Sequence, residues 1–226
     1  MSRRLIFFTS IAHEIRTPLT LIKGPVENLL EQVDDIPQIK EDVILMERNT
    51  ERLIKLVSQI LDFRKIETKG FFLDYTHVNI TKLLQEEFHT FEDLAKRRKI
   101  QYTLECNSED IFAFTDEEAL NKIFSNLFNN AIKYAHKKVS IRLLKPIDNL
   151  TFTIEFENDG LIIPIEMRAK IFEPFYRLKE TLKQQGTGIG LSLTMSLTKL
   201  LHGKVFVKDT DDELNVFVLS LPLKQK

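Results

Sequence analysis

A histidine followed at once by a glutamate is the first pair of residues in this chain that could do chemistry. His13 and Glu14 lie near the N-terminus, and Thr17 follows one helical turn later. An imidazole nitrogen can act as a nucleophile, and a neighbouring carboxylate can accept the proton that the imidazole loses. A single exposed histidine is more often an ordinary surface residue, so this interpretation needs support from the rest of the chain.

A second candidate is a polar face on a predicted helix that ends at Tyr134. Asn126, Asn130 and Lys133 recur at helical spacing and therefore share one face. Carboxamide oxygens suit a hard, partly hydrated Mg²⁺ ion, and a lysine suits the negative charge of phosphate. A polar, solvent-facing stripe would have the same spacing, so both interpretations stay open on spacing alone.

A third candidate is a glycine-rich segment that leads into another predicted helix. Its residues are Gly186, Thr187, Gly188, Ile189, Gly190 and Leu191. Glycines let backbone amides approach a phosphate, and a helix N-terminus adds a positive dipole. The spacing matches neither the phosphate loop nor the dinucleotide motif, and a flexible loop is the commoner explanation of such a segment taken alone. The polar stretch 178–185 before it has the composition of a mobile lid over a nucleotide.

The elements that would position His13 follow a heptad-like seam of apolar residues. The seam runs with spacings of three and four over 5–33, is interrupted at 34–37, and resumes over 39–60. It predicts two long helices in a hairpin, with His13 one position after the seam residue Ala12 and therefore pointing away from the core. Because one hairpin cannot bury two wide apolar stripes, we expect two copies to form a dimeric four-helix bundle.

The pattern changes after Gly70 and predicts an α+β two-layer sandwich with helices on one face of the sheet. Three helices are expected: one capped by Asn79 and reaching about Arg97, one opened by a capping box at 115–118 and reaching Tyr134, and one from Gly190. The expected strands are 71–78, 100–105, 111–114, 138–145, 150–157, 204–208 and 214–220. The expected division is a hairpin at 1–68, a linker with the first strand at 69–78, and a second domain at 79–226.

Composition excludes several classes of function. The 32 Lys and Arg residues balance the 33 Asp and Glu residues, which argues against a nucleic-acid or membrane-surface partner. A single cysteine excludes an intramolecular disulfide framework, and no cluster has the spacing of zinc ligands. No apolar run reaches the length of a membrane span, so we expect no direct membrane contact and a cytoplasmic location.

Taken together, these segments resemble the cytoplasmic core of sensor histidine kinases of two-component systems. Five segments match motifs of that family in the expected order and cover essentially the whole chain. They are the phosphoacceptor box at 7–19, the N box at 126–134, the first glycine box at 157–164, the F box at 171–177 and the second glycine box at 186–191.

The resemblance implies a hairpin for dimerisation and histidine phosphotransfer, followed by an ATP-binding domain of the GHKL type shared with gyrase, Hsp90 and MutL. It implies that His13 receives the γ-phosphoryl group of Mg-ATP, with Glu14 as the base, and passes it to an aspartate of a response-regulator receiver domain. Thr17 matches the position that helps to orient water when such an enzyme dephosphorylates its partner.

The resemblance also implies roles at the nucleotide site. Asn130 would hold Mg²⁺, while Asn126, Lys133 and Arg177 would approach the phosphates. Tyr134 would lie along the adenine, and backbone amides of the second glycine box would cap the phosphate tail. The nucleotide-binding residues expected in this way are Asn126, Asn130, Lys133, Tyr134, Asn158, Asp159, Gly160, Arg177, Gly186, Thr187, Gly188, Ile189, Gly190 and Leu191.

The first glycine box departs from the pattern of the family. Asn158 stands where the family has an aspartate that reads adenine, Asp159 follows one place later, and Ile162 replaces a glycine. An asparagine oxygen can still accept a hydrogen bond from the adenine amino group but lacks charge, which predicts ATP binding weaker by about 1 kcal/mol. A purely structural explanation for Ile162 is that its β-branched side chain packs into the interior of the fold.

Three functions compete to explain these observations. An autophosphorylating histidine kinase explains every motif. A phosphatase-biased pseudokinase or signalling scaffold would explain the altered glycine box. A mechanical ATPase related to gyrase or Hsp90 leaves the hairpin with His13 and Glu14 unexplained. The resemblance further implies that the full-length protein is a membrane receptor.

Overall fold

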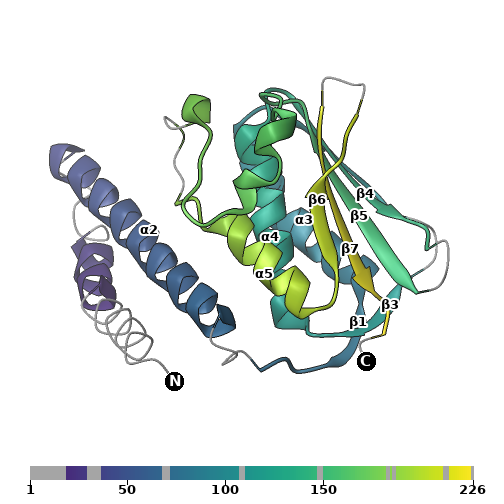
Figure 1. Cartoon of the computed structure of the whole chain (residues 1–226). Helices are drawn as coiled ribbons and strands as arrows, with labels where there is room; N and C mark the ends of the chain where they lie inside the picture. The colour runs from purple at the N-terminus through teal and green to yellow at the C-terminus, as the bar shows by residue number, and fades with distance from the viewer. Residues whose placement is uncertain are drawn as a thin grey trace. The chain divides into compact units, whose positions relative to one another are not determined.

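The computed structural model divides the chain into two compact units, residues 1–71 and 72–226, which are described separately (Figure 1). The described residues are 19–29, 37–67, 72–106, 110–146, 150–181, 184, 187–210 and 214–224. Within these segments no helix has the length and apolar character needed to cross a lipid bilayer.

The first unit contains the two helices that the seam predicts. Residues 19–29 are helical, and α2 runs Pro37–Glu67. The proline predicted to break the pattern is the first residue of α2, a position where its missing N–H costs no hydrogen bond. The predicted start of the first helix and the turn at 34–36 lie outside the described residues.

Contacts between the two helices show that they are antiparallel. Leu19, at the start of the first described helix, packs with Val57 and Leu61 near the end of α2. One turn later, the Lys23 amine lies 3.1 Å from the Glu51 carboxylate. The positions in contact therefore run in opposite directions along the two helices, as they must in a hairpin.

The second unit is a two-layer α+β fold, which confirms the predicted class. Its regular elements are β1 (Thr76–Asn79), α3 (Ile80–Arg97), β2 (Gln101–Glu105), β3 (Phe112–Thr115), α4 (Glu117–Tyr134), β4 (Lys138–Leu144), β5 (Thr151–Asn158), α5 (Gly190–Leu200), β6 (Lys204–Val207) and β7 (Asn215–Pro222), with 3₁₀ turns at Ile165–Met167, Lys170–Phe172 and Lys179–Thr181. The strand expected at 71–78 is shorter, because residues 72–75 are irregular.

Five strands form one sheet in the order β2-β4-β5-β7-β6, and β1 pairs with β3 in a separate ribbon. Only β2 and β4 are parallel in the larger sheet, and the β4–β5 hairpin predicted from the sequence is antiparallel. Helices α3, α4 and α5 lie on one side of this sheet (Figure 1). The middle strand of this sheet is therefore β5, with β4 and β7 as its neighbours.

Aromatic side chains make the core between helices and sheet. The ring of Phe128 in α4 stacks on Phe91 of α3 with centroids 5.8 Å apart and meets Phe156 of β5 edge-on at 5.3 Å. Phe128 and Phe156 have no exposed surface. Side chains alternate along a strand, so the residues of β5 two apart from Phe156 also face the helices.

Helix α3 begins as the sequence predicts. The Asn79 side chain accepts a hydrogen bond from the Lys82 backbone N–H at 3.0 Å, which satisfies one of the free amides of the first turn. Asn79 thus places α3, and α3 supports α4 from the side away from its polar face.

The capping residue of α4 differs from the prediction. Thr115 is the last residue of β3 and pairs with Thr76, so it is not the N-cap. The cap is Asp116, whose Oδ1 accepts from the Ala119 N–H at 2.7 Å. Its second oxygen accepts from the Asp74 N–H at 2.7 Å. A carboxylate can serve two donors in this way, and it ties the irregular segment before β1 to the start of α4.

Replacing Asp116 with alanine is expected to lower the free energy of unfolding of the second unit by about 2–3 kcal/mol. The loss combines a helix cap with a backbone donor left without its acceptor. Asp116→Asn is expected to fall between the wild type and alanine, because its single oxygen can serve only one of the two donors. Urea unfolding followed by circular dichroism measures both, and equal stability of alanine and wild type would contradict the dual role.

Candidate functional site

One face of α4 carries the polar residues expected at a nucleotide site. Asn126, Asn130 and Lys133 are all half-buried on this helix. The other face of the helix is fully apolar and packs on the core, with Leu127 and Ala131 almost completely buried. Because the apolar face fixes the rotation of α4, the three polar side chains have one common direction.

The N-terminus of α5 lies against this face. A Cβ built on Gly190 would be 3.1 Å from the Asn126 Oδ1, so the first residue of α5 almost touches the asparagine. Ile189 occupies the N-cap position, and no side chain of the described residues caps the helix there. The first amides of α5 are therefore available to an anion, as at many phosphate-binding helices.

A backbone clasp fixes the segment that precedes α5. The Phe175 N–H donates to the Gly188 carbonyl at 3.0 Å, which joins the two ends of the stretch between them. Gly188 has φ +75, and a Cβ there would lie 2.8 Å from the Phe175 carbonyl carbon. Phe175 itself has φ 64, a conformation that side chains other than glycine rarely adopt. Glycine at 188 is thus required by both conformation and space.

Arg177 lies inside this clasped stretch. Its Nη2 donates to the carbonyl of Thr181 at 2.7 Å and to the carbonyl of Gln184. The guanidinium therefore ties the backbone carbonyls of Thr181 and Gln184 together, within the polar stretch 178–185.

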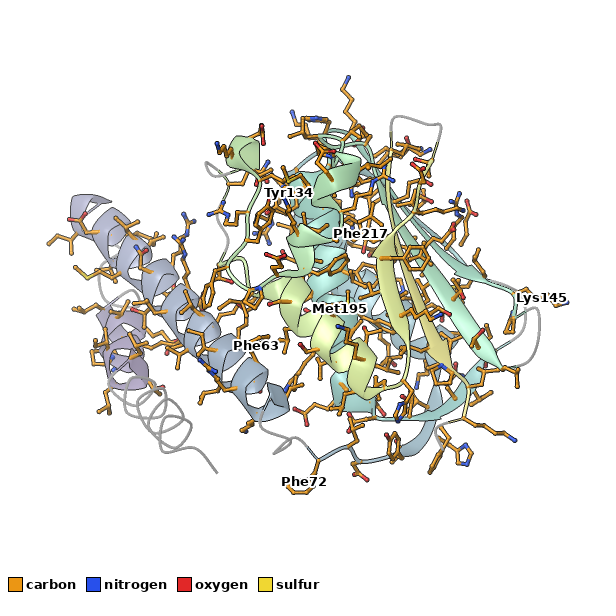
Figure 2. All side chains as sticks on the ribbon, viewed as in Figure 1. Phe63, Phe72, Tyr134, Lys145, Met195 and Phe217 are labelled. Carbon is orange, nitrogen blue, oxygen red and sulfur yellow. The ribbon has the colours of Figure 1, made fainter. Side chains whose placement is uncertain are left out.

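Gly160 lies against Tyr134, the last residue of α4 and the other end of the polar face, which is labelled in Figure 2. A Cβ on Gly160 would lie 2.0 Å from the Tyr134 carbonyl oxygen, so only glycine fits. The Lys133 amine donates to the Tyr134 hydroxyl at 2.8 Å and lies 4.4 Å from the centre of its ring. Asn126 and Tyr134 are eight residues apart, about 12 Å along the axis of α4. That length suits a ligand with a phosphate end and an aromatic end.

Asn158 lies beside Gly160 at the end of β5. Only 2% of its surface is exposed, and its Oδ1 accepts from the Gly160 N–H at 3.1 Å. Asn215 of β7 donates to the same oxygen at 3.3 Å. Asn215 is a part of the site that the sequence interpretation missed, because nothing in one sequence links two asparagines in strands 57 residues apart.

Asp159 binds backbone of its own chain. Its carboxylate accepts from the N–H groups of His136 at 2.9 Å and of Lys137 at 3.0 Å, just after α4 ends. Although burial raises the pKa of this carboxyl, the backbone hydrogen bonds outweigh burial and hold the pKa below its ordinary value. The charged form thus fixes the chain between α4 and β4.

Ile162 is 39% exposed, so the packing that would explain its presence is missing. Among the described residues, positive φ occurs at Gly188, Lys99, Phe175 and His202. The backbone at 162 therefore does not require glycine, and a β-branched side chain is compatible with the loop.

Four of the expected site residues lie outside the described residues: His13, Glu14, Thr17 and Gly186. The other residues of the expected set lie along the C-terminal half of α4 and in the chain beside it. Asn126, in the middle of α4, meets Gly190, with Thr187, Gly188, Ile189 and Leu191 in the adjoining chain and Arg177 in the stretch between Phe175 and Gly188. At the C-terminal end of α4 lie Lys133, Tyr134, Asn158, Asp159 and Gly160, and Asn130 lies on α4 between the two groups.

Metal-binding side chains of the usual kind are not grouped here. In the segments that the structure describes, no three residues of the types His, Cys, Asp and Glu come together in a way that could hold a metal ion. A cation at this site would therefore depend on carboxamide oxygens such as that of Asn130 and on the phosphates of a ligand, a donor set that suits Mg²⁺.

Two family profiles match this chain one after the other. Residues 3–69 match the family described as "His Kinase A (phospho-acceptor) domain". Residues 115–225 match the family described as "Histidine kinase-, DNA gyrase B-, and HSP90-like ATPase". The two matches have the same order as the hairpin and the two-layer domain.

Individual proteins give the same result. Histidine kinase P4 of Formosa agariphila is 32% identical over 97% of this chain, which spans only 16% of that protein. The crystal structure of full-length ShkA in complex with AMPPNP aligns with a TM-score of 0.83, covering 97% of this chain and 46% of that chain. At 24% sequence identity, this similarity establishes the fold alone. Histidine kinase ThkA in complex with the response regulator TrrA has a TM-score of 0.66 at 27% identity, covering 95% of this chain and 60% of that chain.

Proposed function

We propose that this chain, which belongs to the sensor histidine kinases and contains their catalytic core, transfers the γ-phosphoryl group of Mg-ATP to His13. The phosphoryl group then passes from His13 to an aspartate of a response-regulator receiver domain. The single observation that carries the proposal is the pairing of an uncapped α5 N-terminus with the polar face of α4, described above. The chain spans only 16% of histidine kinase P4, so the substrates and partners of the whole protein are proposed rather than shown.

The nucleotide would lie along α4. The amides at the start of α5, with Asn126, would hold the phosphates, since backbone N–H groups at a helix N-terminus attract negative charge. Lys133, whose amine donates to the Tyr134 hydroxyl in this structure, would have to leave that hydroxyl to approach them. Tyr134 and Gly160 would frame the base at the other end. Asn130 would hold Mg²⁺, which when bound neutralises the charge on the phosphates.

The reaction itself would take place at His13. A ring nitrogen of His13 attacks the γ-phosphorus, the bond from phosphorus to the β-γ bridging oxygen breaks, and ADP leaves. Glu14 accepts the proton that the ring loses. A receiver aspartate then takes the phosphoryl group from the histidine nitrogen. When the enzyme instead dephosphorylates its partner, Thr17 would orient the water that hydrolyses the aspartyl phosphate of the receiver domain.

Apolar surface on the hairpin supports a homodimer. Leu21 and Ile22 on the first helix are 69% and 49% exposed, and Leu45, Met46 and Leu53 on α2 are exposed as well. Exposed apolar side chains on both helices of a hairpin are expected to be covered by a second copy in a four-helix bundle.

The remaining assignments rest on the resemblance. We propose that residues 1–68 act in dimerisation and phosphotransfer, 69–78 link, and 79–226 bind nucleotide. We place the core on the cytoplasmic side of a membrane receptor, where ATP is abundant. No nucleic-acid partner is proposed.

The test is incubation of the chain with Mg²⁺ and [γ-³²P]ATP. A kinase acquires a label that is stable to base and labile to acid, as a phosphohistidine is, and a receiver domain removes it. A signalling scaffold, or a pseudokinase that only dephosphorylates its partner, acquires none. Absence of label at millimolar ATP would therefore overturn the proposal in favour of that second function, which Asn158 and Ile162 favour.

A further inference from the structure

Two buried asparagines form a pair at the base end of the site. Asn158 and Asn215 are directly opposite in the β5–β7 register and are 2% and 4% exposed. Asn215 also donates to the Leu161 carbonyl at 2.9 Å and accepts from the Ile163 N–H at 2.9 Å. Asn215 therefore holds the loop after β5 and Asn158 at the same time.

Backbone groups fix which way each amide points. A backbone N–H can only donate, so the atom of Asn158 that faces the Gly160 N–H must be its oxygen. Likewise, Asn215 must turn its nitrogen to the Leu161 carbonyl and its oxygen to the Ile163 N–H. The orientation of both side chains thus follows from chemistry and does not depend on how oxygen and nitrogen were assigned.

This orientation leaves the Asn158 Nδ2 without a hydrogen-bond acceptor among the described residues. The side-chain hydrogen bonds that Asn158 makes to them both involve Oδ1. Among the described residues, Nδ2 does not belong to the fully enclosed side-chain atoms that lack a partner, so it reaches the surface of the site and can donate to a ligand there. Asn158 lies two residues after Phe156 on β5 and so faces the helix side of the sheet, beside the Gly160 contact with Tyr134. A base bound there would supply the acceptor.

We propose that Asn158 makes this site accept 6-oxo purine nucleoside triphosphates, such as GTP, alongside ATP. The inference rests on the proposed function, because it assumes that a nucleotide base lies at this end of α4. An amide N–H can donate to O6 of guanine or to N1 of adenine, since both are acceptors. A carboxylate at the same place accepts from the 6-amino group of adenine and repels the O6 of guanine. The asparagine therefore removes a basis for rejecting guanine.

The experiment compares Mg·AMPPNP and Mg·GMPPNP by isothermal titration with the whole chain. For the wild type, the two dissociation constants are expected to lie within about tenfold of each other. Asn158→Asp keeps the volume and the oxygen that Gly160 and Asn215 use, and it should shift the ratio toward adenine by at least about a hundredfold, as sites that read a polar group do. Asn121→Asp makes the same chemical change on α4 away from the pair and should leave the ratio unchanged.

The outcomes separate this inference from the proposed function. Binding of AMPPNP at least about a hundredfold tighter than GMPPNP by the wild type would overturn the inference and leave the proposed function in place. Binding of neither at millimolar concentration would overturn both. If Asn158→Asp unfolds, the wild-type ratio alone decides.

Discussion

Replacing His13 with glutamine is expected to abolish incorporation of phosphate from [γ-³²P]ATP, with a loss of more than about a thousandfold, as for other nucleophiles removed from enzymes. Glutamine is of similar size and polarity, but its amide nitrogen has no free lone pair for attack on phosphorus. Nucleotide binding should not change, because the expected binding residues all lie in the second unit. Radiolabelling and isothermal titration on the same preparation measure the two effects separately.

A matched control is available in the second unit. His89 lies on α3 with its side chain 69% exposed and near Glu92, and His89→Gln should be labelled like the wild type. Mixed dimers of His13→Gln with Asn130→Asp then report direction, because label appears only if one subunit phosphorylates the other. Label retained by His13→Gln alone would show that another residue is the acceptor.

Much of the fold follows from local sequence signals. Asn79 predicts the start of α3 because its side chain can satisfy an amide of the first turn, and it does so. The alternation of residues over 150–157 predicts a strand, and β5 is found one residue later. These features depend on neighbours within a few residues, which a single sequence contains.

Features set by contacts between distant residues were not predictable. Thr115 and Glu118 satisfy the capping-box pattern, but β3 pairs with β1 up to Thr115, and the cap moves to Asp116. The sequence does not indicate that Asp116 would also bind the backbone of Asp74. The pairing of β3 with β1 and the bond from the Asp74 N–H to Asp116 decide which residue caps α4, and both involve residues far apart in the sequence.

The candidate site shows the same division. Helical spacing alone is enough to group Asn126, Asn130 and Lys133 on one face. Asn215 has no such signal, because its partner Asn158 meets it only when β5 and β7 pair. The left-handed backbone of Phe175 is equally hidden, since glycine is the residue that a sequence marks for that conformation.

Replacing Gly160 with alanine is expected to destabilise the second unit by about 3 kcal/mol and to abolish nucleotide binding. The new Cβ would lie 2.0 Å from the Tyr134 carbonyl oxygen and 3.0 Å from the Asn158 Oδ1. The carbonyl belongs to the last turn of α4 and cannot rotate away, so the loop must move, which has the cost of overpacking a core. Movement of the loop displaces Asn158 and breaks its bond to the Gly160 N–H.

The control for this change is another glycine in the same chain. Gly24 lies in the helix 19–29, and a Cβ there meets nothing within 4 Å. Gly24→Ala is expected to leave nucleotide binding intact and to stabilise its helix by up to about 1 kcal/mol, because alanine is the better helix former. Urea unfolding and isothermal titration with Mg·AMPPNP distinguish the two variants. Wild-type binding by Gly160→Ala would mean that the end of α4 yields without disturbing the loop, and the close approach of Gly160 to Tyr134 would then have no part in holding the base.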